Sequence, residues 1–193
     1  MADQQCSIIV MASGNGSNFQ ELIDAVAAGR IANSRIIRLV TNRQKAYAIS
    51  RAEKAGIPWD CFNLISNGFI SRGEKDEKKV AEARGKYDAA LADKILSEEK
   101  RPDLRKTEEF DGAFAIERAF DEFKAGRLTR TGIMAHYVVL EVDRGEPIVT
   151  QEVEWHGEEL EEFKEKMHSH EHKLIVDATA KVVEKILKEK GGK

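Results

Sequence analysis

A single stretch, residues 8–23 (IIVMASGNGSNFQELI), constrains most strongly how this chain can fold. Its apolar run, residues 8–12, predicts a buried strand, and apolar residues at helical spacing after Asn18 predict a helix. Gly14 and Gly16 lie between the two, where they allow positive φ angles and let a ligand approach the backbone closely. The stretch therefore predicts a strand, a glycine turn and a helix.

The glycine turn has the chemistry of a phosphate site. Ser17 or Asn18 can act as the N-cap, and the N–H groups of the first helical turn would point into the loop with the positive end of the helix dipole. A glycine turn can also be a simple connection, and the local pattern does not separate the two. Phe19 occupies the third glycine position of a dinucleotide fingerprint, and no Gly-Lys-Ser/Thr follows to form a nucleotide P-loop.

The composition fits one globular domain over residues 1–193. Hydrophobic residues are 41% and charged residues 34%, and the net charge of -3 offers no basic surplus for nucleic acid, although a local basic pocket for a phosphorylated small molecule is compatible with it. Cys6 and Cys61 provide no disulfide framework or metal-ligand spacing, and Cys61 lies in a predicted strand as a core residue. Without a basic leader or a long apolar segment, we expect a cytoplasmic protein that has no membrane partner.

Strands and helices alternate through the first half of the chain. Residues 35–41 and 58–64 predict two further strands, with a helix over residues 46–55 between them. This alternation implies parallel strands joined by right-handed crossovers, and thus an α/β fold. Ligands of such sheets lie beyond the carboxyl ends of the strands, where the glycine turn is found.

The second half of the chain is less regular. Residues 76–95 predict a long amphipathic helix, but no apolar run follows residues 101–104, where a fourth strand would be expected. The remaining predicted elements are a helix over residues 113–125, a strand over 131–142, its antiparallel partner over 148–155 and a helix over 158–190.

Three segments together resemble the phosphoribosylglycinamide formyltransferase family. They are residues 8–25 (IIVMASGNGSNFQELIDA), 132–148 (GIMAHYVVLEVDRGEPI) and 168–179 (HSHEHKLIVDAT). This family transfers a formyl group from 10-formyltetrahydrofolate to the amine of glycinamide ribonucleotide in purine biosynthesis. The resemblance extends from about residue 7 to 183 with one break, and it implies a Rossmann-like fold, a mainly parallel sheet flanked by helices, with the substrate phosphate on the glycine turn.

By position, the resemblance also implies roles for individual residues that bind the ribonucleotide. Arg84 corresponds to a basic residue near the phosphate, and Glu171 to the glutamate that holds the ribonucleotide. The turn residues that would hold the phosphate are Asn15, Gly16, Ser17 and Asn18.

The resemblance implies roles in folate binding and in catalysis for three later residues. Val139 and Leu140 would border 10-formyltetrahydrofolate, the implied co-substrate, and no metal is implied. Asp143 corresponds to the catalytic aspartate, which orients a histidine and a water.

One segment of the family pattern is absent. Between Asp103 and Phe110 the family has a strand, a helix and a further strand that ends in Asn-x-His-Pro, and this chain has none of these. That asparagine and histidine polarise the formyl carbonyl and shuttle the proton, and no other Asn-x-His occurs in the sequence. Since losing one oxyanion donor costs about a hundred- to a thousandfold in rate, we expect impaired turnover.

The absent strands are central ones, so their loss leaves backbone groups and apolar faces without partners. The chain can close the gap by pairing strands anew, by recruiting a second copy as a homodimer, or it can fold poorly. Pairing of the 131–142 strand with the first strand is our preferred expectation.

Local pattern alone gives several residues ordinary roles. Asp143 lies in Asp-Arg-Gly-Glu-Pro, which is typical of a turn, and His136 lies in an apolar strand, where a hydrogen-bonded core histidine is expected. Histidines near residue 170 suggest zinc, because residues four apart share a helical face, but no third ligand stands at a recognised spacing. These histidines are His168, His170 and His172.

Three functional hypotheses follow. The first is a formyltransferase of purine biosynthesis with impaired chemistry, and the second is a non-catalytic module that binds a phosphorylated ligand. The third is a truncated product of a formyltransferase gene. The abrupt junction of Leu104 and Arg105 favours a deletion over gradual decay, because both flanks still match the family.

Overall fold

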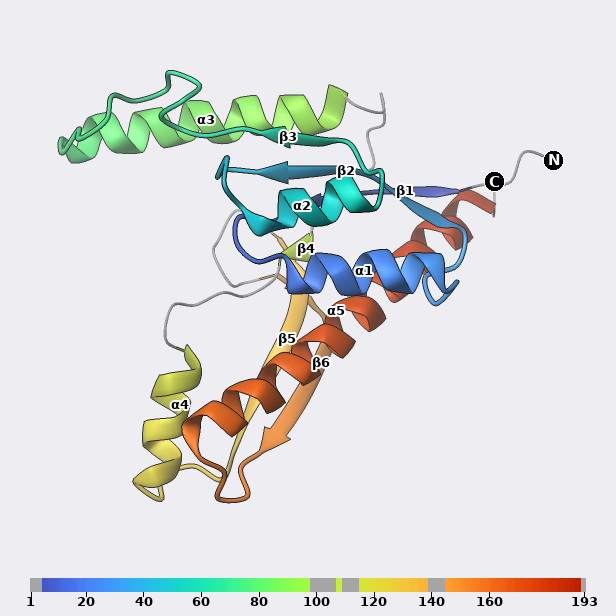
Figure 1. The fold of residues 1–193 in the computed structure, drawn as a ribbon, viewed down its shortest axis with the longest axis vertical. Coiled ribbons are helices and arrows are strands. Elements are labelled where there is room, and N and C mark those ends of the chain that lie inside the picture. Colours follow the sequence, from blue (N-terminus) through green and yellow to red (C-terminus); the bar gives the residue numbers. More distant parts are fainter. Residues whose placement is uncertain (1–4, 98–106, 109–114, 139–144, 192–193) are drawn as a thin grey trace. The chain divides into compact units, whose positions relative to one another are not determined.

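The computed structural model describes residues 5–97, 107–108, 115–138 and 145–191, which fall into two units (Figure 1). The glycine-turn unit comprises Ser7–Ile23 and Arg35–Leu104, and the hairpin unit comprises Met1–Cys6, Asp24–Ser34 and Arg105–Lys193. The boundary runs through the first helix. Each unit is described by itself, and the single domain expected over residues 1–193 stays a prediction.

The glycine-turn unit is built on a parallel sheet. Its strands, in spatial order, are β1 (Cys6–Met11), β2 (Ser34–Thr41) and β3 (Trp59–Cys61). The connecting helices are α1 (Ser17–Ala27) and α2 (Tyr47–Lys54), followed by α3 (Glu77–Ser97). All of these elements were predicted, although β3 is shorter than expected. The Asn63 side chain explains this, because its Oδ1 accepts hydrogen bonds from the N–H groups of Ile65 and Ser66 and turns the chain away from the sheet.

Helices cover both faces of this sheet. Leu39 of β2 is fully buried against α1 and α2. Its neighbour Arg38 points to the opposite face, since side chains alternate along a strand, and donates to Asp60 of β3 at 2.8 Å. Lys94 of α3 forms an ion pair with the same Asp60 at 3.3 Å, which places α3 on that second face (Figure 1). The predicted α/β class, a parallel sheet flanked by helices, is therefore confirmed.

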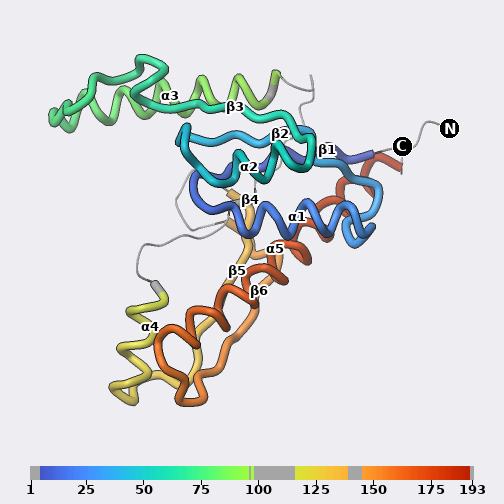
Figure 2. Tube along the Cα trace, viewed as in Figure 1, coloured from blue at the N-terminus to red at the C-terminus, as the bar shows by residue number. Residues whose placement is uncertain are grey.

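The hairpin unit contains an antiparallel hairpin packed along a long helix (Figure 2). Its elements are β4 (Thr107–Glu108), α4 (Ala115–Lys124), β5 (Arg130–Tyr137), β6 (Pro147–Glu154) and α5 (Leu160–Gly191). Aromatic side chains fill its core, and Phe123 of α4 stacks on Trp155 with ring centroids 5.7 Å apart. Phe163 of α5 is fully buried against both α4 and β6.

The expected pairing of the 131–142 strand with the first strand is wrong for the described residues. There β5 pairs with β6 and with β4, while β1 pairs with β2. The two residues of β4 pair antiparallel with Tyr137 and His136. Because β4 lies just past the junction of Leu104 and Arg105, backbone close to that junction supplies hydrogen-bonding partners for β5.

None of the helices in the described part of the chain combines the length and the apolar character needed to cross a bilayer.

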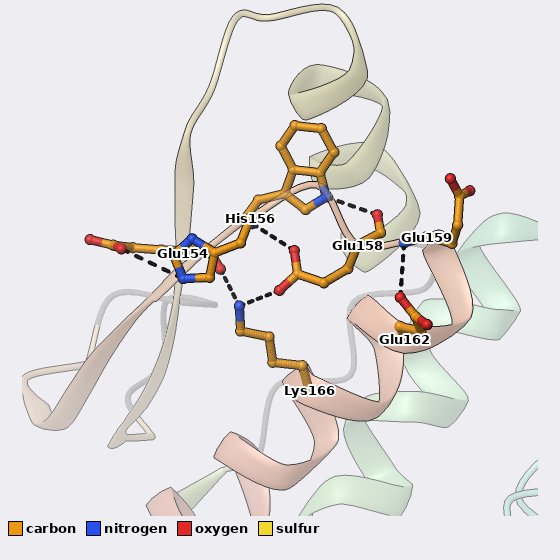
Figure 3. A network of polar contacts seen from close by, with 7 residues as sticks. Glu154, His156, Glu158, Glu159, Glu162 and Lys166 are labelled. Carbon is orange, nitrogen blue, oxygen red and sulfur yellow. Dashed lines mark hydrogen bonds and ion pairs between the residues drawn. The ribbon is translucent and has the colours of Figure 1, made fainter.

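A polar network joins the end of β6 to α5 (Figure 3). Lys166 Nζ donates to Glu158 Oε1 at 2.5 Å and to the carbonyl oxygen of Glu154 at 2.6 Å, and the His156 N–H donates to Glu158 Oε2 at 2.6 Å. Burial alone would raise the pKa of Glu158, but hydrogen bonds from Lys166, from its own N–H and from His156 outweigh it and lower the pKa from 4.5 to about 2.

In the variant Glu158→Gln, the free energy of unfolding should depend less on pH in the acid range than it does in wild type. Because the folded pKa of Glu158 is depressed, its ionised form stabilises the protein above about pH 4.5, and this contribution is lost as the pH falls toward about 2. At pH 7 the variant should be destabilised by about 1–3 kcal/mol, and its difference from wild type should shrink on acidification. Urea unfolding between pH 7 and pH 3 measures this.

Glu161→Gln is the matched control. Glu161 is 83% exposed and pairs with Lys164 on the surface, so its unfolding free energies should follow those of wild type. Equal pH slopes for Glu158→Gln and wild type would contradict the assignment.

Candidate functional site

Residues 14–18 form the turn that links β1 to α1. Helix α1 begins at Ser17, and the Gln20 N–H donates to the Gly16 carbonyl at 3.0 Å. The N-cap is therefore Gly16, and the expectation that Ser17 or Asn18 would take that place is wrong. Gly16 has a φ of +72°, a conformation that side-chain-bearing residues rarely adopt, which is why a glycine occupies the position.

The turn packs closely on α2. A Cβ at Gly16 would lie 2.7 Å from Ala48 Cβ and 3.0 Å from Ala48 Cα, and Ala48 is fully buried. The Ala48 N–H donates to the Gly14 carbonyl at 3.3 Å, while the α2 N-cap, Ala46, makes no side-chain capping bond. The turn thus satisfies a donor at the start of α2 and leaves no room for a side chain at Gly16.

The first turn of α1 keeps unused hydrogen-bonding capacity. Within the described part of the chain, the backbone N–H groups of Ser17, Asn18 and Phe19 have no acceptor. The Asn18 side chain lies at the same turn, and its acceptor Oδ1 is buried and receives no hydrogen bond from the described residues. Open N–H groups at the positive end of a helix dipole attract anions, so the geometry is suited to a phosphate.

Arg51 of α2 braces the turn. Its Nε donates to the Asn15 carbonyl at 3.0 Å, its Nη2 to Asn15 Oδ1 at 2.8 Å and its Nη1 to Gln20 Oε1 at 3.1 Å. The guanidinium also lies 5.0 Å from the ring centroid of Tyr47. Sequence reasoning missed Arg51, because in sequence it is one of many charged residues on a helix. The available signal was its position three residues after Ala48, which faces the turn.

The other predicted site residues are not brought to the turn by the described contacts. Arg84 is exposed on α3, and no described hydrogen bond or ion pair joins it to residues 14–18. Glu171 belongs to the hairpin unit, where its Oε2 lies 3.1 Å from His168 Nδ1. Val139, Leu140 and Asp143 lie outside the described residues, so their roles stay predictions.

The histidines and Cys61 have mainly structural surroundings. His136 is 2% exposed and its Nδ1 lies 2.9 Å from the Tyr137 carbonyl, which requires a proton on Nδ1, so the core histidine is confirmed. His170 Nδ1 lies 2.6 Å from Gln151 Nε2. Burial raises the pKa of the Cys61 thiol, opposite to an activated nucleophile. Among the described residues, no three candidate ligands gather around a metal position.

Comparisons with known proteins identify the family. A model described as "Formyl transferase" matches residues 6–104 and 108–179. A phosphoribosylglycinamide formyltransferase from Schizosaccharomyces pombe is 34% identical over 92% of this chain and 97% of its own length. The chain belongs to the phosphoribosylglycinamide formyltransferase family. The family member from Saccharomyces cerevisiae is 33% identical, over 94% of this chain and 99% of its own length.

Solved structures of this formyltransferase family share the fold. Glycinamide ribonucleotide transformylase 1 from Symbiobacterium toebii superposes with a TM-score of 0.70 at 22% identity, covering 94% of this chain and 89% of that one. The corresponding protein from Geobacillus kaustophilus gives 0.65 at 27% identity, covering 93% and 99%.

The two yeast formyltransferases contain residues that this chain lacks. Their alignments extend over 207 and 216 positions, more than the 193 residues of the whole chain. The match to the family model is itself interrupted at residues 105–107.

Gly16→Ala should destabilise the protein, whereas Gly14→Ala should be tolerated. The new Cβ at position 16 would clash with Ala48 and strain a positive φ, at a cost of about 1–2 kcal/mol for the backbone alone. Position 14 has open space for a Cβ and lacks a positive φ. Thermal and urea unfolding of both variants measure the difference, and equal stabilities would contradict the packing described for the turn.

Proposed function

We propose that this family member binds glycinamide ribonucleotide with the phosphate on residues 14–18. The observation that carries the proposal is the open set of N–H groups at the first turn of α1, beside Asn18. A phosphate dianion there would accept several hydrogen bonds and interact with the positive end of the helix. The relatives named phosphoribosylglycinamide formyltransferase support this choice of phosphorylated ligand.

The proposed reaction is formyl transfer in de novo purine biosynthesis, with 10-formyltetrahydrofolate as the formyl donor. By resemblance to the family, Val139 and Leu140 would border the folate, while Arg84 and Glu171 would contact the ribonucleotide. A cytoplasmic location accompanies this proposal. Association into a homodimer is a further part of the proposal.

The chemistry explains why turnover should be slow. When an amine attacks a formyl carbon, negative charge develops on the carbonyl oxygen and a proton leaves the nitrogen, so positioned donors and a proton acceptor are needed. Asp143 would support that centre by resemblance, but the sequence has no Asn-x-His to polarise the carbonyl and shuttle the proton. Holding two substrates together would leave only the acceleration that proximity gives.

A second candidate function is a binding module without catalysis. The observation that favours it is the same lack of any Asn-x-His, in a chain that keeps the whole glycine turn. If the junction of Leu104 and Arg105 arose in a truncated gene product, the same binding behaviour is expected. The transcript across that junction distinguishes this origin.

Formyl transfer should be at least about a hundredfold slower than in the Schizosaccharomyces pombe relative assayed in parallel, because an oxyanion donor and a proton shuttle are missing. A spectrophotometric assay with ribonucleotide and 10-formyltetrahydrofolate measures turnover, and calorimetric titration measures binding of each ligand separately. Ribonucleotide binding without turnover favours the binding module. Turnover equal to the relative's would contradict impairment, and absence of ribonucleotide binding would contradict the proposal itself.

Asn18→Ala should weaken ribonucleotide binding by roughly tenfold, since it removes a side-chain NH2 group that would donate to an oxygen at the proposed phosphate position. Calorimetry gives the Kd, and thermal melting checks folding. Asn67→Ala is the control, because Asn67 bonds the Asn63 N–H and not the turn. Equal affinities for Asn18→Ala and Asn67→Ala would remove the turn from the site.

A further inference from the structure

Arg51 is a charged residue beside the turn whose contacts the proposed function has not used. Its guanidinium reaches two places at once, Asn15 before α1 and Gln20 in the first turns of α1. Three of its five N–H groups are engaged in these bonds. A rigid planar fork of this kind fixes the spacing between the turn and the helix, which a single lysine ammonium could not do.

The charge of Arg51 has no carboxylate partner among the described residues. Its hydrogen bonds go to the carbonyl oxygen of Asn15 and to the side-chain amide oxygens of Asn15 and Gln20. The only aromatic contact described for Arg51 is with Tyr47, whose ring centroid lies 5.0 Å from the guanidinium. Surface arginines elsewhere in the described chain do form ion pairs, as Arg127 does with Glu122. No acid among the described residues therefore neutralises the positive charge beside the turn, which favours an anionic ligand there.

We propose that Arg51 is a positioning residue for the phosphate turn. It holds Asn15, and with it the turn that precedes the open N–H groups of residues 17–19, in one conformation. In this way it raises phosphate affinity through Asn15 without contacting the phosphate. This inference rests on the proposed function, because it takes the ribonucleotide phosphate as the ligand. It adds a residue from α2 to a site that the sequence places on β1 and α1.

The geometry separates this role from two simpler ones. If Arg51 acted only as a nearby positive charge, Arg51→Lys would keep full affinity. If Arg51 only stabilised the folded protein as a whole, its loss would lower the melting temperature without changing the conformation of residues 14–18 in particular. A positioning role through Asn15 predicts instead that the fork itself is required and that Arg51 and Asn15 act as one unit.

The test compares Arg51→Lys, Arg51→Gln, Asn15→Ala and the double variant Asn15→Ala/Arg51→Gln in the full chain. Calorimetry gives the Kd for glycinamide ribonucleotide. Both Arg51 variants should bind roughly tenfold more weakly or worse, since charge-assisted bonds are lost. The double variant should be no weaker than Arg51→Gln alone, because both changes break the same link.

Lys54→Ala is the matched control. Lys54 is an exposed cation one helical turn further along α2, so its removal changes the charge equally and should keep the Kd within about twofold of wild type. Amide hydrogen exchange without ligand should be faster in residues 13–20 of Arg51→Gln than in Lys54→Ala. This second measurement reports bracing of the turn whether or not a ligand binds.

The outcomes separate the two proposals. Wild-type protein that binds no ribonucleotide overturns the proposed function, and unchanged exchange in Arg51→Gln then also overturns the bracing. If wild-type protein binds ribonucleotide, two results would overturn the positioning role and leave the proposed function standing. One is an Arg51→Lys variant with the same Kd as wild type. The other is a double variant in which the effects of Asn15→Ala and Arg51→Gln on the Kd add up. Should Arg51→Gln fail to fold, Arg51→Lys and Asn15→Ala decide the question by the same comparison.

Discussion

The closeness of Gly16 to Ala48 is the contact on which the glycine turn depends. Gly16 has no side chain and Ala48 has one of the smallest, so the turn can pack directly against the start of α2. This approach lets the Gly14 carbonyl accept a bond from α2 and brings Asn15 within reach of Arg51. The turn is then held by its carbonyls and side chains, while among the described residues the N–H groups of Ser17, Asn18 and Phe19 have no acceptor.

The glycine turn and the break in the match to the family lie far apart along this chain. The turn and its braces come from residues before position 55, whereas the catalytic groups of the formyltransferase family map to positions after 103. The described contacts of residues 14–18 are with α1 and α2. In the part of the chain that the structure describes, the hydrogen bonds of residues 14–18 are made with residues before position 55.

Much of the fold could be predicted from the sequence because most elements carry a strong local signal. The strand, turn and helix at residues 8–23, and the hairpin of β5 and β6, show periodicity that depends only on neighbouring residues. The pairing of β5 could not be predicted, because a two-residue strand such as β4 has no periodicity of its own. Arg51 was missed for a related reason: its partners Asn15 and Gln20 lie more than 30 residues away. For Val139, Leu140 and Asp143 the family resemblance remains the sole basis.

The strand pairing of β5 in the described part of the chain has a practical consequence. The two residues of β4 pair only with Tyr137 and His136, so among the described residues the same edge of β5 from Arg130 to Ala135 carries no strand partner. Unpaired strand edges act as templates for intermolecular pairing and aggregation. Aggregation through this edge would increase with protein concentration, which therefore has to be controlled during purification and crystallisation.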